Sequence, residues 1–192
     1  MQPLVLASTS LYRKELLQRL GLDFTTTAPN VDESRLPEES PEHLVRRLAE
    51  EKARAVAPQF PDALIIGSDQ VAVVGADILT KPGTHKNAVD QLQRCAGQAV
   101  NFFTGLCLLN ARSGKVQIEV VPFRVHFRPL NAAQIENYLR REKPYSCAGS
   151  FKSEGLGIAL FERLEGDDPA TLIGLPLIRL VRMLEVEGMP VI

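Results

Sequence analysis

The stretch ALIIGSDQVAVV, residues 63–74, is apolar on both sides of a polar centre, Gly67-Ser68-Asp69-Gln70. Each flank is aliphatic and too short for a helix, so the pattern predicts buried strand on either side of the centre. Asp69 is therefore expected in or beside the core, where an ionised carboxylate is costly unless it is paired, hydrogen-bonded or bound to a metal. Two explanations stay open. Gly67 kinks the chain and Asp69 caps its own backbone, or Asp69 belongs to a functional site.

Composition and charge narrow the class of protein. With 192 residues, 45% hydrophobic and 23% charged, the chain is expected to form one domain over residues 1–192. A net charge of -1 without any block of Lys or Arg argues against a nucleic-acid partner. The three cysteines lack CxxC spacing, which argues against a disulfide frame or a zinc site and predicts reduced thiols in the cytoplasm. Because no apolar run reaches ~18 residues, no membrane partner is expected.

Apolar periodicity and turn residues predict alternating strands and helices. Strands are expected at 3–7, 24–29, 64–66, 71–74, 78–79, 99–110, 115–128 and 158–164, and helices at 11–20, 41–57, 84–96, 132–141 and 177–187. Residues 145–157 are too rich in glycine and hydroxyl side chains for regular structure, so they are expected to form a loop. Together these elements predict a mixed α/β sheet with flanking helices.

Several basic and hydroxyl side chains are candidate phosphate ligands. Ser8-Thr9-Ser10 precedes a helix with Arg13 one turn in, which suits either an anion site or simple N-capping. Lys52 lies at helical spacing among apolar residues, so its ammonium either extends to solvent or enters a phosphate pocket. Lys81 precedes Pro82-Gly83 and is therefore held in an extended conformation.

Glu33 and Thr104-Gly105 are further candidates for the site. Glu33 follows a predicted strand and is either a solvated loop acid or a carboxylate that meets Asp69 over a divalent cation. Thr104-Gly105, inside a predicted strand, leaves room for a ligand or for another stretch of backbone to approach.

Taken together, the motifs resemble those of the Maf family of nucleotide pyrophosphatases over nearly the whole chain. The resemblance rests on these segments in this order: residues 6–17 (LASTSLYRKELL), Val31-Asp32-Glu33, Glu51-Lys52-Ala53, Gly67-Ser68-Asp69-Gln70, Leu79-Thr80-Lys81-Pro82, Thr104-Gly105 and Gly174-Leu175-Pro176-Leu177. It implies an inosine-triphosphatase-like fold, with an elongated central sheet, two lobes and a central cleft. A homodimer is also what the family suggests.

The resemblance implies hydrolysis of a nucleoside triphosphate between its α and β phosphates with the help of a divalent cation, Mg²⁺, Mn²⁺ or Co²⁺. Carried over by position, Asp69 resembles the proton acceptor, and Glu33 and Asp69 the metal ligands. Whether Asp69 acts as base, as ligand or as both stays open. The residues that resemble catalytic or substrate-binding groups of the family are Lys52, Lys81, Ser8, Ser10, Arg13 and Thr104.

Three positions resemble the branch of the family that accepts 7-methyl-GTP: Tyr12, Gln70 and Glu154. The commonest family pattern has Pro-Arg-Arg where this chain has Leu11-Tyr12-Arg13. An N7-methylated guanine is cationic and stacks well on an aromatic ring, and Glu154 suits the N1 and N2 donors of guanine. The alternatives are a pyrophosphatase for other modified or pyrimidine nucleotides such as UTP and dTTP, and a nucleotide-binding regulator of septum formation.

Overall fold

A computed structural model describes residues 2–192. The strands are β1 (Leu4–Ala7), β2 (Thr25–Thr27), β3 (Leu64–Val74), β4 (Asp77–Leu79), β5 (Ala99–Asn110), β6 (Val116–Phe127) and β7 (Phe161–Glu165). The α-helices are α1 (Leu11–Gln18), α2 (Pro41–Val56), α3 (His85–Cys95), α4 (Ala132–Glu142), α5 (Pro169–Ile173) and α6 (Leu177–Val186). Short 3-10 helices are η1 (Ala57–Gln59), η2 (Ala148–Ser150) and η3 (Leu156–Leu160).

The strands form one mixed sheet, which confirms the predicted α/β class. Their order is β2-β1-β3-β5-β6-β7, and β4 pairs with β3 off this path. β1 runs parallel to both β2 and β3, whereas the β3–β4 and β6–β7 pairs are antiparallel. The chain divides into two compact units, and β3, β5 and β6 supply residues to both of them.

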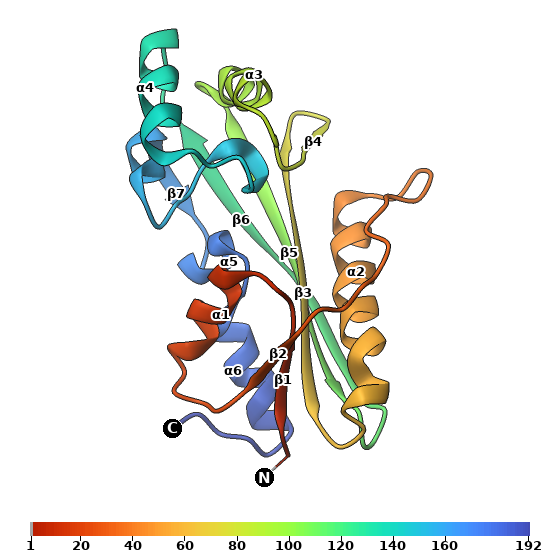
Figure 1. The fold of residues 1–192 in the computed structure, drawn as a ribbon. Coiled ribbons are helices and arrows are strands. Elements are labelled where there is room, and N and C mark those ends of the chain that lie inside the picture. Colours follow the sequence, from red (N-terminus) through yellow and green to blue (C-terminus); the bar gives the residue numbers. More distant parts are fainter. Residues whose placement is uncertain (1) are drawn as a thin grey trace. The chain divides into compact units, whose positions relative to one another are not determined.

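The first unit comprises residues 2–70, 103–121 and 168–192. Its helices cover both faces of its strands: α2 lies on one side of β1 and β3, and α1, α5 and α6 lie on the other (Figure 1). Alternation along the strands explains the two cores. Leu64 and Ile66 of β3 pack with α1 and α6, while Ile65 packs with Ala49 and Ala53 of α2.

The second unit comprises residues 71–102 and 122–167. Helices α3 and α4 lie against each other in it. Its aromatic cluster is made of Phe102, Phe127, Phe151 and Phe161, whose rings meet edge to face with centroids 5.0–5.5 Å apart. Since such pairs are favourable beyond the area that they bury, Phe151 attaches the glycine-rich loop firmly to β5, β6 and β7.

Three sequence expectations about elements were wrong. β3 runs unbroken through the polar centre at residues 67–70, where the sequence predicted an interruption between two strands. Residues 158–160 belong to the 3-10 helix η3, and the strand begins only at Phe161. The helix α5 was missed, although Asp168 accepts a hydrogen bond from Ala170 N and Pro169 takes the first helical position, a standard start signal. The single domain over residues 1–192 and the central cleft stay predictions.

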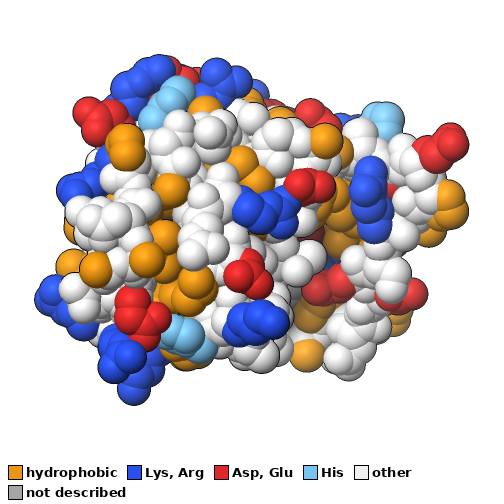
Figure 2. Space-filling view, turned by 90° about the horizontal axis from the view of Figure 1, so that it is seen from above, with side chains coloured by type: hydrophobic (Ala, Val, Ile, Leu, Met, Phe, Trp, Pro, Cys, Tyr) orange, Lys and Arg blue, Asp and Glu red, His pale blue; other side chains and the backbone are white. Residues whose placement is uncertain are grey.

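The surface shows no concentration of one charge on the face visible in Figure 2, where Lys and Arg side chains alternate with Asp and Glu. This agrees with a chain of 22 basic and 23 acidic side chains. Among the helices of residues 2–192, none combines the length and apolar character that crossing a bilayer requires.

Candidate active site

Lys52 joins the two carboxylates that the sequence singled out. Its Nζ lies 2.6 Å from Asp69 Oδ1 and 2.6 Å from Glu33 Oε1. The Lys52 side chain is 5% exposed and that of Asp69 12%, while that of Glu33 is 57% exposed. A buried ammonium between two carboxylates offsets the cost of removing each charge from water. Asp69 is therefore paired through space with a residue of α2 and does not cap its own backbone.

Two glycines allow α2 to approach the sheet closely enough for this pairing. A Cβ atom on Gly67 would lie 2.0 Å from the carbonyl oxygen of Ala49, and one on Gly105 would lie 2.1 Å from that of Val45. Real Cβ atoms do not come so close, so only glycine fits at either position. Of the two possibilities for Thr104-Gly105, the structure shows the approach of another backbone, that of α2.

Arg13 lies near the same carboxylates but from the opposite helix layer. Its Nε donates to the carbonyl oxygen of Gly174 at 2.9 Å. Burial lowers the pKa of Arg13 from its ordinary value, while the negative charges of Asp69 and Glu33 raise it. The site of the first unit thus collects two positive and two negative side chains around one end of β1.

The serines before α1 have structural partners. Ser10 is the N-cap of α1 and its Oγ accepts from Arg13 N at 3.4 Å. The buried Ser8 accepts from Ser10 N at 3.1 Å through its Oγ. Both hydroxyl oxygens thus accept from nearby backbone N–H groups, that of Ser10 as the helix cap, and a phosphate contact of Ser8 and Ser10 stays a prediction.

The opposite face of β3 is bound to the end of α5. Ser68 Oγ donates to the Gly174 carbonyl at 3.0 Å, and Gln70 Nε2 donates to Thr104 Oγ1 at 2.9 Å and to the Thr171 carbonyl at 2.7 Å. Thr104 is fully buried and its hydroxyl also donates to Thr171 O at 3.2 Å. These contacts give Thr104 a structural role, and substrate binding by it stays a prediction.

Sequence reasoning missed Ser68 and Gly174 as neighbours of this site. Both contribute to placing Arg13, since the Gly174 carbonyl accepts from Arg13 and Ser68 alike. Gly174 has a φ of +123°, which disfavours any other residue. A signal was present, because Gly174-Leu175-Pro176 is one of the motifs on which the resemblance rests.

The sequence is similar to that of known proteins over nearly its whole length. The family model for Maf-like proteins matches residues 3–187. The chain belongs to the Maf family. A 7-methyl-GTP pyrophosphatase of Nitrosococcus oceani is 60% identical over 189 residues, which is 98% of this chain and 95% of the relative. One of Pseudomonas fluorescens is 56% identical over 191 residues, which is 100% of this chain and 100% of the relative to the nearest per cent.

The fold is similar to that of a solved structure. The Ham1 protein of Staphylococcus aureus has a TM-score of 0.54 and 13% sequence identity, and the match covers 97% of this chain and 100% of that one. The Maf chain thus has a mixed α/β fold like that of Ham1.

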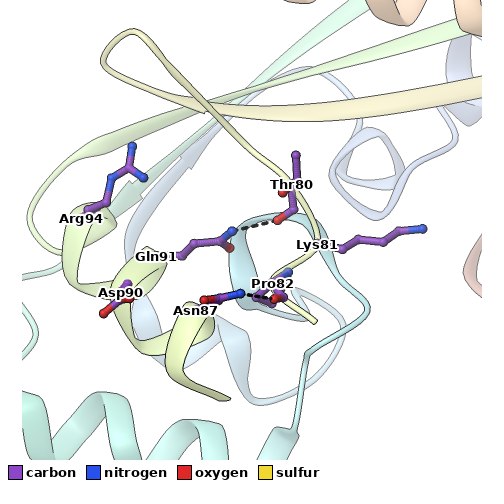
Figure 3. Close-up of a pocket in the computed structure, with 7 residues that line it drawn as sticks. All are labelled: Thr80, Lys81, Pro82, Asn87, Asp90, Gln91 and Arg94. Atoms are coloured by element: carbon purple, nitrogen blue, oxygen red, sulfur yellow. Dashed lines mark hydrogen bonds between the residues drawn. The ribbon is translucent and has the colours of Figure 1, made fainter. Parts of the chain in front are cut away.

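The other predicted residues of this Maf chain are placed as follows. Tyr12 is half-buried on α1 in the first unit, and Lys81 and Glu154 are exposed residues of the second unit. The turn with Lys81 is attached to α3, where Gln91 Nε2 donates to Thr80 O and Asn87 Nδ2 to Pro82 O, both at 2.9 Å. Figure 3 shows the Lys81 side chain extending away from α3.

Glu33 and Asp69 are the residues of this site that could bind a divalent cation. Glu33 Oε1 and Asp69 Oδ1 both lie 2.6 Å from Lys52 Nζ, so the two carboxylates are close together, on either side of the ammonium. Within residues 2–192, no group of three or more His, Cys, Asp or Glu is arranged to hold a metal. Mg²⁺ is usually bound by one or two carboxylates together with water and substrate phosphates. The chemistry of these two donors suits such a cation, and its binding here stays a prediction.

Proposed function

We propose that this Maf protein hydrolyses the α–β phosphoanhydride bond of 7-methyl-GTP to 7-methyl-GMP and pyrophosphate. The observation that carries the proposal is the buried Lys52 ammonium between Glu33 and Asp69, with Arg13 close by. The names of the relatives that are 60% and 56% identical support the choice of substrate.

The side chains of the first unit have distinct roles in this mechanism. Asp69 accepts a proton from the water whose oxygen attacks the α-phosphorus, and pyrophosphate leaves with the electron pair of the broken P–O bond. Lys52 and Arg13 stabilise the negative charge that accumulates on the phosphoryl oxygens, which is the main source of catalysis in such reactions. Glu33 and Asp69 would hold a divalent cation, which when bound supplies further positive charge to the phosphates.

Recognition of the base follows from the chemistry of the predicted side chains. A methyl group on N7 gives guanine a delocalised positive charge, which an aromatic ring such as that of Tyr12 attracts. A carboxylate such as that of Glu154 accepts from the two adjacent donors N1–H and N2–H of guanine, an arrangement that uracil and thymine lack. Gln70 is proposed to contribute to the selection of the base as well.

The proposal extends to the setting of the protein. Cys95 and Cys107 are buried free thiols, and burial raises the pKa of each to about 12. Thiols kept in this form support a cytoplasmic location. A homodimer is also proposed, on the family resemblance alone.

The experiment that tests the function is a panel of 7-methyl-GTP, GTP, UTP and dTTP with detection of pyrophosphate, run with Mg²⁺, Mn²⁺ and Co²⁺. The wild type is expected to show its highest kcat/KM with 7-methyl-GTP. Asp69→Asn should lower kcat by about 10²–10⁴-fold with an unchanged circular dichroism spectrum, because general base catalysis contributes on that order. Near-normal turnover by Asp69→Asn would contradict the mechanism, and a preference for UTP or dTTP would contradict the substrate.

A further inference from the structure

Glu33 lies in a long segment without regular structure. Between β2 and α2, residues 28–40 contain neither helix nor strand. The segment includes two non-glycine residues with positive φ, Asn30 at 45° and Glu38 at 56°, a backbone conformation that needs surrounding contacts to persist. Long irregular segments in compact proteins are often functional, and this one carries a proposed metal ligand whose side chain is 57% exposed.

Arg47 of α2 is the side chain that attaches this segment. Its Nε donates to Glu39 Oε1 at 2.7 Å and its Nη2 to Glu39 Oε2 at 2.8 Å, so the guanidinium binds the carboxylate with two parallel hydrogen bonds. Nη2 also donates to the Ser34 carbonyl at 3.0 Å, and Nη1 to Glu51 Oε2 at 3.0 Å. Charge-assisted bidentate pairs of this kind combine strength with a defined geometry.

Burial and additional hydrogen bonds strengthen the Arg47–Glu39 pair. The Glu39 side chain is 7% exposed and that of Arg47 is 22% exposed, so water competes little for their hydrogen bonds. Glu39 Oε2 accepts from Leu36 N at 3.0 Å, and the Glu39 carbonyl accepts from Arg35 Nε at 2.6 Å. The carboxylate of Glu39 thus joins the segment to itself as well as to α2.

The position of Arg47 connects this pair to the site. Ser34, whose carbonyl Arg47 binds, directly follows Glu33, and Lys52, whose Nζ binds Glu33, lies five residues after Arg47 on the same helix. The main chain beside Glu33 and the carboxylate of Glu33 are therefore both held by α2. Neither contact alone would fix the direction of the side chain, because the segment has no strand or helix of its own.

From these contacts we propose that Arg47, acting through Glu39 and Ser34, is a positioning residue for Glu33. It holds the Glu33 carboxylate beside Asp69 so that the two can bind the divalent cation of the nucleotide complex. This inference rests on the proposed function, in which Glu33 is a metal ligand. Arg47 itself touches neither substrate nor metal.

The test compares Arg47→Met with a matched control, Arg54→Met. Arg54 forms an ion pair with Glu50 on the same helix, but in an exposed position, 55% and 34% exposed respectively. Arg47→Met should lower kcat/KM for 7-methyl-GTP by about 10–100-fold, the usual effect of losing an outer partner of a metal ligand, and should raise the Mn²⁺ concentration needed for half-maximal rate. Arg54→Met should leave both quantities within about twofold of the wild type, since exposed pairs contribute little. Arg47→Lys keeps the positive charge but cannot form the two parallel hydrogen bonds, so both quantities should lie between those of Arg47→Met and the wild type.

A double mutant distinguishes positioning from a general loss of stability. In a Glu33→Gln background, adding Arg47→Met should cause no further loss of kcat/KM, because the carboxylate that Arg47 positions is already gone. If the losses of kcat/KM from the two single substitutions multiplied in the double mutant, the proposal would be overturned. An Arg47→Met variant with wild-type metal dependence would overturn it as well. If Arg47→Met does not fold, Glu39→Gln, which keeps the volume of the side chain, decides by the same criteria.

A second measurement needs no turnover. Amide hydrogen exchange of residues 28–40 should be faster in Arg47→Met and unchanged in Arg54→Met, and calorimetric Mn²⁺ binding in the presence of the product 7-methyl-GMP should weaken only in the former. Unchanged exchange and binding would overturn the positioning role. Failure of the proposed function would look different, since the wild type would then release no pyrophosphate while these two readouts still reported on Arg47.

Discussion

Gln70 shows how a single side chain can be constrained by its surroundings. The Nε2 atom faces three acceptors, Thr104 Oγ1 and the carbonyl oxygens of Thr171 and Leu172, at 2.9, 2.7 and 3.3 Å. The amide nitrogen is therefore committed to α5 and β5. Oε1 remains as the atom of Gln70 that could meet a ligand, and it can only accept a hydrogen bond. A role of Gln70 in selectivity would thus require a ligand that donates.

The replacement Gln70→Glu tests this orientation. It substitutes an acceptor for the donor that faces two carbonyl oxygens, so their partner is lost and like partial charges are brought together. We expect the free energy of unfolding to fall by about 1–3 kcal/mol, measured by urea denaturation at pH 7. Gln93→Glu, at an exposed position of α3, is the control and should change little. Equal stability of the two variants would show that the Gln70 amide is not held in this way.

Some residues of the site were predictable and others were not. The apolar flanks of residues 63–74 correctly predicted that Asp69 is buried and needs a partner. The same pattern wrongly suggested a break in the strand, because Ser68, Asp69 and Gln70 find their partners far away in the chain, in Gly174, Lys52 and Thr171. Such long-range satisfaction of polar groups cannot be read from local periodicity.

At the scale of elements, local signals predicted the helices best. Helices were predicted at residues 41–57, 84–96 and 132–141, and the structure has helices there. Their N-caps are Ser40, Thr84 and Asn131, whose side chains accept from the backbone N–H three residues on. The close packing of α2 on β3 and β5 could be predicted only in part. A glycine within a strand indicates that another group comes close, but it does not identify that group.

The glycine in β3 gives a direct test of this packing. Gly67→Ala places a Cβ atom 2.0 Å from the Ala49 carbonyl oxygen, so α2 must move away from the sheet. Overpacking of this kind costs about 1–3 kcal/mol or more, and we expect a lowered melting temperature by differential scanning calorimetry. Because α2 carries Lys52, kcat should fall as well. Wild-type stability would mean that α2 does not lie as close as described.

At the scale of the whole molecule, the family resemblance anticipated what periodicity could not. Periodicity predicted a mixed sheet with helices, whereas the two compact units, with β3, β5 and β6 supplying residues to both, depend on pairings over long sequence distances.

The buried charges of the first unit also affect the stability of the whole molecule, because any group whose pKa differs between the folded and unfolded chain makes global stability depend on pH.

Glu39 is the group for which this dependence can be stated. The hydrogen bonds from Arg47 are the main cause that lowers the pKa of Glu39 from its ordinary value of 4.5 to about 2. The ionised carboxylate therefore stabilises the folded chain fully above pH 4.5, and that contribution is lost as the pH falls from 4.5 towards 2. In urea denaturation across this range, the free energy of unfolding of the wild type should fall more steeply than that of Glu39→Gln, which has no carboxyl group to titrate. Parallel curves for the two proteins would show that the Arg47–Glu39 pair does not favour ionisation of Glu39 in the folded chain, and would remove the electrostatic basis for its attachment of residues 28–40 to α2.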